Sequence, residues 1–172
     1  MRVANEDAPD TERTIGVVAD FFETAAHDVM RITLHDQFRR LRQGVVEAVN
    51  AQAGLTARPA GVEAPADDDP ESLALVIDGI GMLITYKAEV HDRCAFVFTE
   101  FGRVTPEDEL PALRRLLDIN VLMYRGGAPA FTRDPDSGHI LLLCEVPLDV
   151  ATPTTVLAYL HQLSGHARQW RQ

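Results

Sequence analysis

The chain has 172 residues, 46% of them hydrophobic, so it can bury its own core and is most simply one domain. Its 26 acidic residues outnumber 16 basic ones, a formal net charge of −10. This charge argues against sequence-independent binding to nucleic acid or anionic membrane, because both need a basic face. No apolar run reaches the roughly 20 residues of a membrane span, and the acidic N-terminus lacks a signal-peptide pattern. We therefore expect a soluble, cytoplasmic protein.

The first predicted elements are helical. Apolar residues recur at steps of three and four between residues 15 and 29, and again further on. The second stripe is Leu34, Phe38, Leu41, Val45 and Val49. Thr33 is expected to cap this second helix, which should end near Gly54. Neither Pro nor Gly separates the two stripes, so one bent helix is an open alternative.

An acidic, proline-containing stretch at 56–71 follows and predicts a loop. Its run of three aspartates lacks the spacing of a calcium-binding loop. Three segments of alternating residues come next, at 72–78, 81–90 and 93–101, and a tight turn at Asp78–Gly81 joins the first two. Short turns between alternating segments predict an antiparallel meander.

The segment from Thr105 to Tyr124 predicts a helix, with Thr105 as its cap and Pro106 as its first residue. One apolar stripe is formed by Leu110, Leu113, Leu117 and Val121. It is widened by Leu116, Ile119, Leu122 and Met123 until the last two turns are apolar almost all round. One core cannot cover so wide a stripe, which predicts that part of it faces a partner.

The stretch "RGGAPAFTRDPDSGHILLLCEVPL", Arg125 to Leu148, predicts a β-hairpin. Its glycine pair ends the helix, and "DPDSG" forms the turn between two strands. A last helix follows, with Thr152 as its cap and Pro153 as its first residue. The predicted fold class is α+β: an antiparallel sheet, made of a three-strand meander plus a hairpin, with helices packed on it in the order α-α-β-β-β-α-β-β-α.

The sequence offers little chemistry. Metal-binding His-Glu-x-x-His and Cys-x-x-Cys spacings, the Gly-x-Ser-x-Gly motif and the phosphate-binding loop are all absent. Ser137 and His139 lie two apart without an evident third partner, and Asp134 and Asp136 sit in a hydrophilic turn. Cys94 and the second cysteine, Cys144, fall inside apolar runs and are expected to be buried free thiols. We therefore predict no enzyme, no cofactor and no metal site.

The segment Leu116–Gln172 resembles the second half of a type III secretion chaperone of the Tir chaperone (CesT) family. The shared pattern is a leucine-rich helix, a Gly-Gly turn, a strand, an acidic Gly turn, an apolar strand and a final helix ending near Trp. Here these are Leu113–Met123, Gly126–Gly127, Ala130–Arg133, Asp134–Gly138, His139–Leu148 and Thr152–Trp170. The resemblance divides the chain into an N-terminal helical extension, 1–32, and a secretion-chaperone-like α+β domain, 33–172.

This resemblance implies a homodimeric, ATP-independent cytoplasmic chaperone. It would bind the N-terminal region of a secreted effector in extended form and keep it secretion-competent, with no nucleic acid and no membrane insertion. The implied client-binding residues are Leu34, Phe38, Leu41, Val45, Val49, Leu75 and Ile84. The implied dimer-interface residues are Leu113, Leu117, Val121, Ala130 and Phe131.

Other interpretations stay open. The same apolar stripes also suit plain core packing, because a helix–sheet domain needs such faces in any case. At the level of function, the alternatives are a YbjN-like regulatory or interaction module outside secretion, an enzyme with an unrecognised site, and a subunit of a larger assembly.

Overall fold

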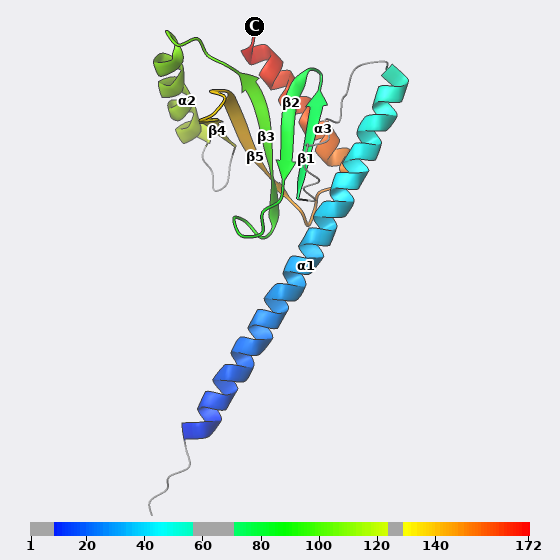
Figure 1. Ribbon diagram of the computed structural model, residues 1–172, viewed down its shortest axis with the longest axis vertical. Coiled ribbons are helices and arrows are strands. Elements are labelled where there is room, and N and C mark those ends of the chain that lie inside the picture. Colours follow the sequence, from blue (N-terminus) through cyan, green and yellow to red (C-terminus); the bar gives the residue numbers. More distant parts are fainter. Residues whose placement is uncertain (1–8, 57–70, 124–128) are drawn as a thin grey trace, which may run out of the picture.

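The computed structural model describes residues 9–56, 71–123 and 129–172, and the side chains of its first helix from Val29 to Gln52. The loop predicted at 56–71 and the Gly126–Gly127 turn therefore lie almost wholly outside the described residues. The elements, shown in Figure 1, are α1 Pro9–Thr56, β1 Ser72–Ile77, β2 Ile80–Thr85, β3 Cys94–Gly102, α2 Glu109–Met123, β4 Ala130–Arg133, β5 Ile140–Pro147 and α3 Pro153–Trp170.

The first two predicted helices are one helix, α1, of 48 residues. The expected cap at Thr33 is wrong, because the Thr33 hydroxyl lies in mid-helix and donates to the Val29 carbonyl at 2.9 Å. A helix of this length spans about 70 Å, and its N-terminal half extends well beyond the sheet (Figure 1). The proposed division at residue 32 falls inside this helix and stays a prediction.

The five strands form one antiparallel sheet in the order β1-β2-β3-β5-β4, so the meander and the hairpin are confirmed. Asp78 and Gly79, with φ of 52° and 79°, form the two-residue turn between β1 and β2. Positive φ at both positions is what a hairpin with the usual right-handed twist requires. β3 and β5 pair at the centre, from Cys94↔Pro147 to Gly102↔Ile140.

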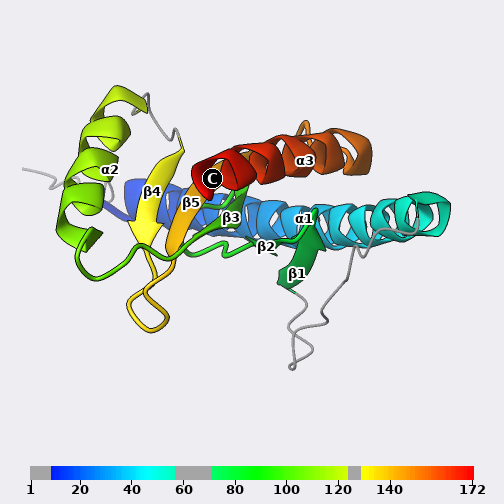
Figure 2. The ribbon, with the colours of Figure 1, turned by 90° about the horizontal axis from the view of Figure 1, so that it is seen from above.

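Helices α1 and α3 pack side by side on one face of the sheet (Figure 2). Every second residue of β1, β3 and β5 points to these helices and is buried, as alternation along a strand dictates. The Thr152 cap is confirmed: its hydroxyl accepts from the Thr155 N–H, and the Thr155 hydroxyl accepts from the Thr152 N–H. At Gly44 a Cβ atom would run into the Pro153 ring, so glycine lets α1 and the start of α3 approach.

Helix α2 lies beside β4, at the edge of the sheet (Figure 2). It begins at Glu109, three residues later than the predicted first residue, Pro106. Pro111 has no N–H to donate, so the first bond of the helix runs from the Ala112 N–H to the Asp108 carbonyl, at 2.9 Å. Thr105 belongs to a preceding turn, in which its carbonyl accepts from the Asp108 N–H.

Within the described part of the chain, no helix is both long and apolar enough to cross a membrane.

Candidate interaction surfaces

The apolar stripe of α1 is part of the core. Val45 and Val49 are 0% and 1% exposed, and Phe38 is 1% exposed. The Phe38 ring lies 5.6 Å from the ring of Tyr86, whose hydroxyl donates to the Asp92 carbonyl at 2.8 Å. These contacts hold the C-terminal half of α1 against the sheet.

All seven residues expected to bind a client share this buried layer. They are Leu34, Phe38, Leu41, Val45, Val49, Leu75 and Ile84, and none is more than 8% exposed. The structure brings them together, but as packing between helix and sheet. Contact between these side chains and a client stays a prediction, and it would require α1 to separate from the sheet.

Helix α2 differs, because most of its apolar surface is uncovered. Leu116 is buried, at 3% exposed, while Leu113, Ile119 and Met123 pack against the core only in part. Four large apolar side chains face outward: Leu110 at 58%, Leu117 at 64%, Val121 at 77% and Leu122 at 80% exposed. The sequence pattern therefore predicted correctly that this core could not cover the whole stripe.

A reciprocal pair of hydrogen bonds joins α2 to β4. The Asn120 amide donates to the Phe131 carbonyl at 2.9 Å, and its oxygen accepts from the Phe131 N–H at 2.7 Å. Near the start of α2, Glu109 accepts from the Arg133 guanidinium at 2.7 Å. Because β4 is an edge strand, these bonds fix α2 and the sheet edge as one continuous surface.

The five residues expected at a dimer interface lie on or beside this surface. Leu117 and Val121 are exposed, and Leu113, Ala130 and Phe131 are partly buried. The Phe131 ring packs edge-on against Phe101, with centroids 5.1 Å apart, and stacks on Trp170 at 6.1 Å. Contact with a second copy is not tested by this placement and stays a prediction.

The face of the sheet opposite α1 and α3 carries a second apolar surface, which sequence reasoning did not single out. The pairing register puts Ala74, Leu83, Phe98, Leu143 and Ala130 in one row across all five strands. A shallow hollow of about 400 Å³ lies on this face, lined by Gly81, Met82, Leu83, Phe98, Glu100 and Leu141. In the sequence, the sign of this surface was that apolar residues occupy both alternating sets of positions along the strands. A sheet with one solvated face needs apolar residues in only one of these sets.

The turn between β4 and β5 shows no catalytic arrangement among its described side chains. The Ser137 hydroxyl donates to the Asp134 carboxylate and accepts from the His139 backbone N–H, while Nδ1 of the His139 ring lies 3.5 Å from Oε1 of Glu100. Hydrogen bonds from the Ser137 hydroxyl and from the backbone N–H groups of Asp136 and Ser137 outweigh slight burial and lower the pKa of Asp134. These contacts shape a turn, as expected of an Asp-Pro-Asp-Ser-Gly sequence.

Both cysteines are buried free thiols, as predicted. Burial raises the pKa of Cys144, which lies on β5. Burial also raises the pKa of Cys94, and nearby carboxylates raise it further. Both thiols are therefore kept protonated at neutral pH.

Comparison with known proteins gives the fold and the family. No curated protein sequence is significantly similar to this chain. Among solved structures, a chain of the HopA1–SchA chaperone–effector complex is 14% identical, with a TM-score of 0.50 over 77% of this chain and 94% of its own. A chain of the complex of the Yersinia pestis type III secretion chaperone SycH with a stable fragment of YscM2 is 19% identical, with a TM-score of 0.48 over 73% and 96% of the two chains.

The ExoT–SpcS complex from Pseudomonas aeruginosa also contains a similar chain, at 19% identity, with a TM-score of 0.48 over 77% of this chain and 96% of its own. At 14% identity, the likeness to the HopA1–SchA chain concerns the fold alone. The sequence model of the Tir chaperone protein (CesT) family matches residues 57–171, well over half of the chain. That match includes every strand of the sheet, α2 and the whole of α3. The chain therefore belongs to the Tir chaperone protein (CesT) family.

Proposed function

We propose that this chain is a type III secretion chaperone. Acting in the cytoplasm as a homodimer, it binds the N-terminal region of a secreted effector in extended form and keeps that region competent for secretion. The observation that carries this proposal is the family match over residues 57–171. The proposed role consists of binding and release and needs neither ATP nor a catalytic step.

The dimer is proposed to form through α2 and β4. Four large apolar side chains of α2 are more than half exposed, from Leu110 to Leu122. Soluble monomers rarely leave a contiguous apolar patch of this kind uncovered. A two-fold pairing would cover the patch with the same patch of a second copy, and the Asn120 clamp would present both elements in a fixed geometry.

The client is proposed to lie along β1 and over the open face of the sheet. Among the described strands, β1 pairs with β2 alone and so forms one edge of the sheet. An extended peptide can add to such an edge through its backbone, while its alternate side chains enter apolar hollows. The hollow around Leu83 and Phe98 lies next to β1 and is the described site that fits this mode.

An extended client suits a complex that must later be taken apart. A disordered segment loses conformational entropy when it binds, so its affinity is lower than the buried area alone would give. The net charge of −10 favours clients whose N-terminal region is basic, since complementary charge speeds association.

The test is capture of the client and mapping of its bound segment. The tagged full chain is purified from the bacterium that encodes it, and the co-purified protein is identified by mass spectrometry and truncated from either end. We expect one secreted protein, retained through roughly its first hundred residues and in the absence of ATP. A partner held only through a folded C-terminal domain would contradict the proposal.

Two matched variants test where the client binds. Leu83→Glu puts a charge at the hollow, whereas Val90→Glu puts the same charge on a side chain that is 71% exposed in the β2–β3 connection. Leu83→Glu should lower affinity for the captured segment by a factor of about ten or more, which is about 1.4 kcal/mol, and Val90→Glu should leave it unchanged. If both variants bound the captured segment with equal affinity, the open face would not be the client site. The chaperone role itself is tested separately, by the capture experiment.

A further inference from the structure

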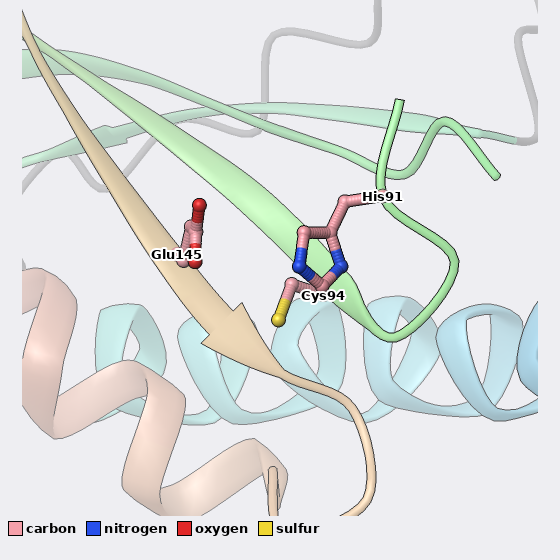
Figure 3. A group of neighbouring side chains, drawn as sticks. All are labelled: His91, Cys94 and Glu145. Atoms are coloured by element: carbon pink, nitrogen blue, oxygen red, sulfur yellow. The ribbon is translucent and has the colours of Figure 1, made fainter. Parts of the chain in front are cut away.

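Three side chains of different metal-binding types meet at one end of the sheet. His91 comes from the β2–β3 connection, Cys94 is the first residue of β3, and Glu145 lies on β5 (Figure 3). One nitrogen, the thiol sulfur and one carboxylate oxygen all lie within 4.8 Å of one another. The sequence contains the first two as a close pair, but only the pairing of β3 with β5 brings Glu145 to them.

The backbone sets this arrangement. Phe96 pairs with Glu145 and Cys94 with Pro147, so Cys94 and Glu145 are diagonal neighbours on the same face of two central strands. The His91 N–H donates to the Lys87 carbonyl at 3.1 Å, which closes a turn above them.

The His91 ring is held in place by two further contacts. Its Nδ1 accepts from the Arg93 N–H at 3.3 Å, and the ring lies edge-on to Phe96. While Nδ1 accepts, Nε2 carries the ring proton, so a metal at Nε2 requires the other tautomer; Figure 3 shows the ring turned toward the other two side chains.

The electrostatic surroundings of the cluster favour a cation. The carboxylates of Glu145, Asp149 and Asp92 act on the Cys94 side chain, against the single positive charge of Arg93. The half-buried Glu145 therefore lies in negative surroundings. A divalent cation would relieve this repulsion and convert the thiol into a thiolate ligand.

We propose that His91, Cys94 and Glu145 form a binding site for Zn²⁺, with water as the fourth ligand. Imidazole with thiolate is a donor set that zinc accepts and that magnesium and calcium do not favour. Zinc–ligand bonds of about 2.0–2.3 Å put neighbouring ligand atoms roughly 3.5 Å apart, so the side chains must close by about 1 Å. Binding releases the thiol proton to solvent and moves the imidazole proton to Nδ1, which gives up the long bond from Arg93.

Bound zinc would link the β2–β3 connection to β5. The site lies on the same open face as the hollow around Leu83, further along β3 and β5, but it shares no residue with that hollow, so its existence does not depend on the proposed chaperone role. A ligand that binds the folded state alone raises stability by mass action. Zinc should therefore raise the melting temperature of the full chain.

The test is titration of the metal-free full chain with Co²⁺, a spectroscopic substitute, followed by competition with Zn²⁺. We expect one Co²⁺ per chain and a near-ultraviolet thiolate-to-cobalt absorption band that Zn²⁺ abolishes. Cys94→Ser should remove the band. His91→Gln and Glu145→Gln should each weaken binding by a factor of about ten or more, since even outer-shell changes cost about 10- to 100-fold.

Cys144→Ala and His139→Gln are the controls, because they remove another buried thiol and another imidazole near a carboxylate. Both should keep the band, and circular dichroism reports whether each variant is folded. The assignment is overturned if no thiolate band forms, if the band survives Cys94→Ser, or if Zn²⁺ binds the three site variants as tightly as the unchanged chain.

Discussion

Two apolar helical stripes of this chain look alike in the sequence and have opposite surroundings in the structure. The stripe of α1 from Leu34 to Val49 is at most 8% exposed, whereas Leu117 and Val121 of α2 are 64% and 77% exposed. Helix α1 lies on the sheet beside α3, while α2 lies at the edge beside β4. The period of a stripe thus predicts that a face is apolar, but the position of the helix relative to the sheet decides what covers it.

The largest expected effect comes from truncation in the α1 stripe. Phe38→Ala leaves a cavity between α1 and Tyr86, and it should lower the free energy of unfolding by about 3–5 kcal/mol. Urea denaturation followed by circular dichroism measures this. Val90→Ala, at an exposed position, is the control and should change it by no more than about 0.5 kcal/mol. A small loss for Phe38→Ala would mean that α1 is not firmly packed and that its stripe is open to a client.

Two neighbouring leucines sharpen the comparison within α2. Leu116 is 3% exposed and Leu117 is 64% exposed. Leu116→Ala should cost about 2–5 kcal/mol, and Leu117→Ala should change the stability of the monomer by no more than about 0.5 kcal/mol. Denaturation at several protein concentrations separates monomer stability from any contribution of association. Similar losses for both, independent of concentration, would place Leu117 in the core.

The clamp between α2 and β4 should have a smaller effect. Asn120→Ala leaves the backbone N–H and carbonyl of Phe131 without their partner, which should cost about 1–3 kcal/mol. Asn120→Asp is the matched variant, because a carboxylate still accepts from the N–H but cannot donate to the carbonyl. Its loss should be intermediate. If Asn120→Ala were as stable as the unchanged chain, the clamp would not be what holds α2 at the edge.

The smallest effect is expected at the turn between β1 and β2. Burial raises the pKa of Asp78. This effect is outweighed by hydrogen bonds from Ser164, at 3.0 Å, and from His161, at 3.3 Å, and by the charges of His161 and Arg168. The pKa of Asp78 is therefore lowered from 3.8. A carboxyl group whose pKa is lower in the folded state stabilises the fold at pH values above its unfolded-state pKa. This contribution is lost as the pH falls through the folded-state pKa.

Asp78→Asn removes this charge while keeping a side chain that tolerates the positive φ of 52°. It should cost about 1 kcal/mol at pH 7, and the difference from the unchanged chain should shrink as the pH falls below about 4. Urea denaturation at pH 7 and pH 3 measures both values. A difference that grows on acidification would mean that the Asp78 pKa is raised in the folded state.

Much of the fold followed from local patterns. Alternation gave the strands, and Thr152 with Pro153 marked the start of α3 because capping depends on adjacent residues. The start of α2 was misplaced because the sequence shows where capping residues stand and not which backbone groups are bonded around Pro111. The Thr33 cap failed for a similar reason, since a threonine hydroxyl also bonds within a helix.

The surfaces were harder to predict than the fold. The width of the α2 stripe predicted an uncovered face, but the α1 stripe left client binding and plain core packing both open. The row through Leu83 and Phe98, and the meeting of Cys94 with Glu145, depend on strand register. Register arises from pairing between distant segments, which a pattern along one segment does not contain.

The most direct test of the account is the mass of the full chain in solution, measured by light scattering during size-exclusion chromatography. We expect twice the chain mass of 19.0 kDa for the unchanged protein, and 19.0 kDa for a folded Val121→Glu variant. A mass of 19.0 kDa for the unchanged protein at every concentration would contradict the account, since the exposed face of α2 would then have no second copy to cover it.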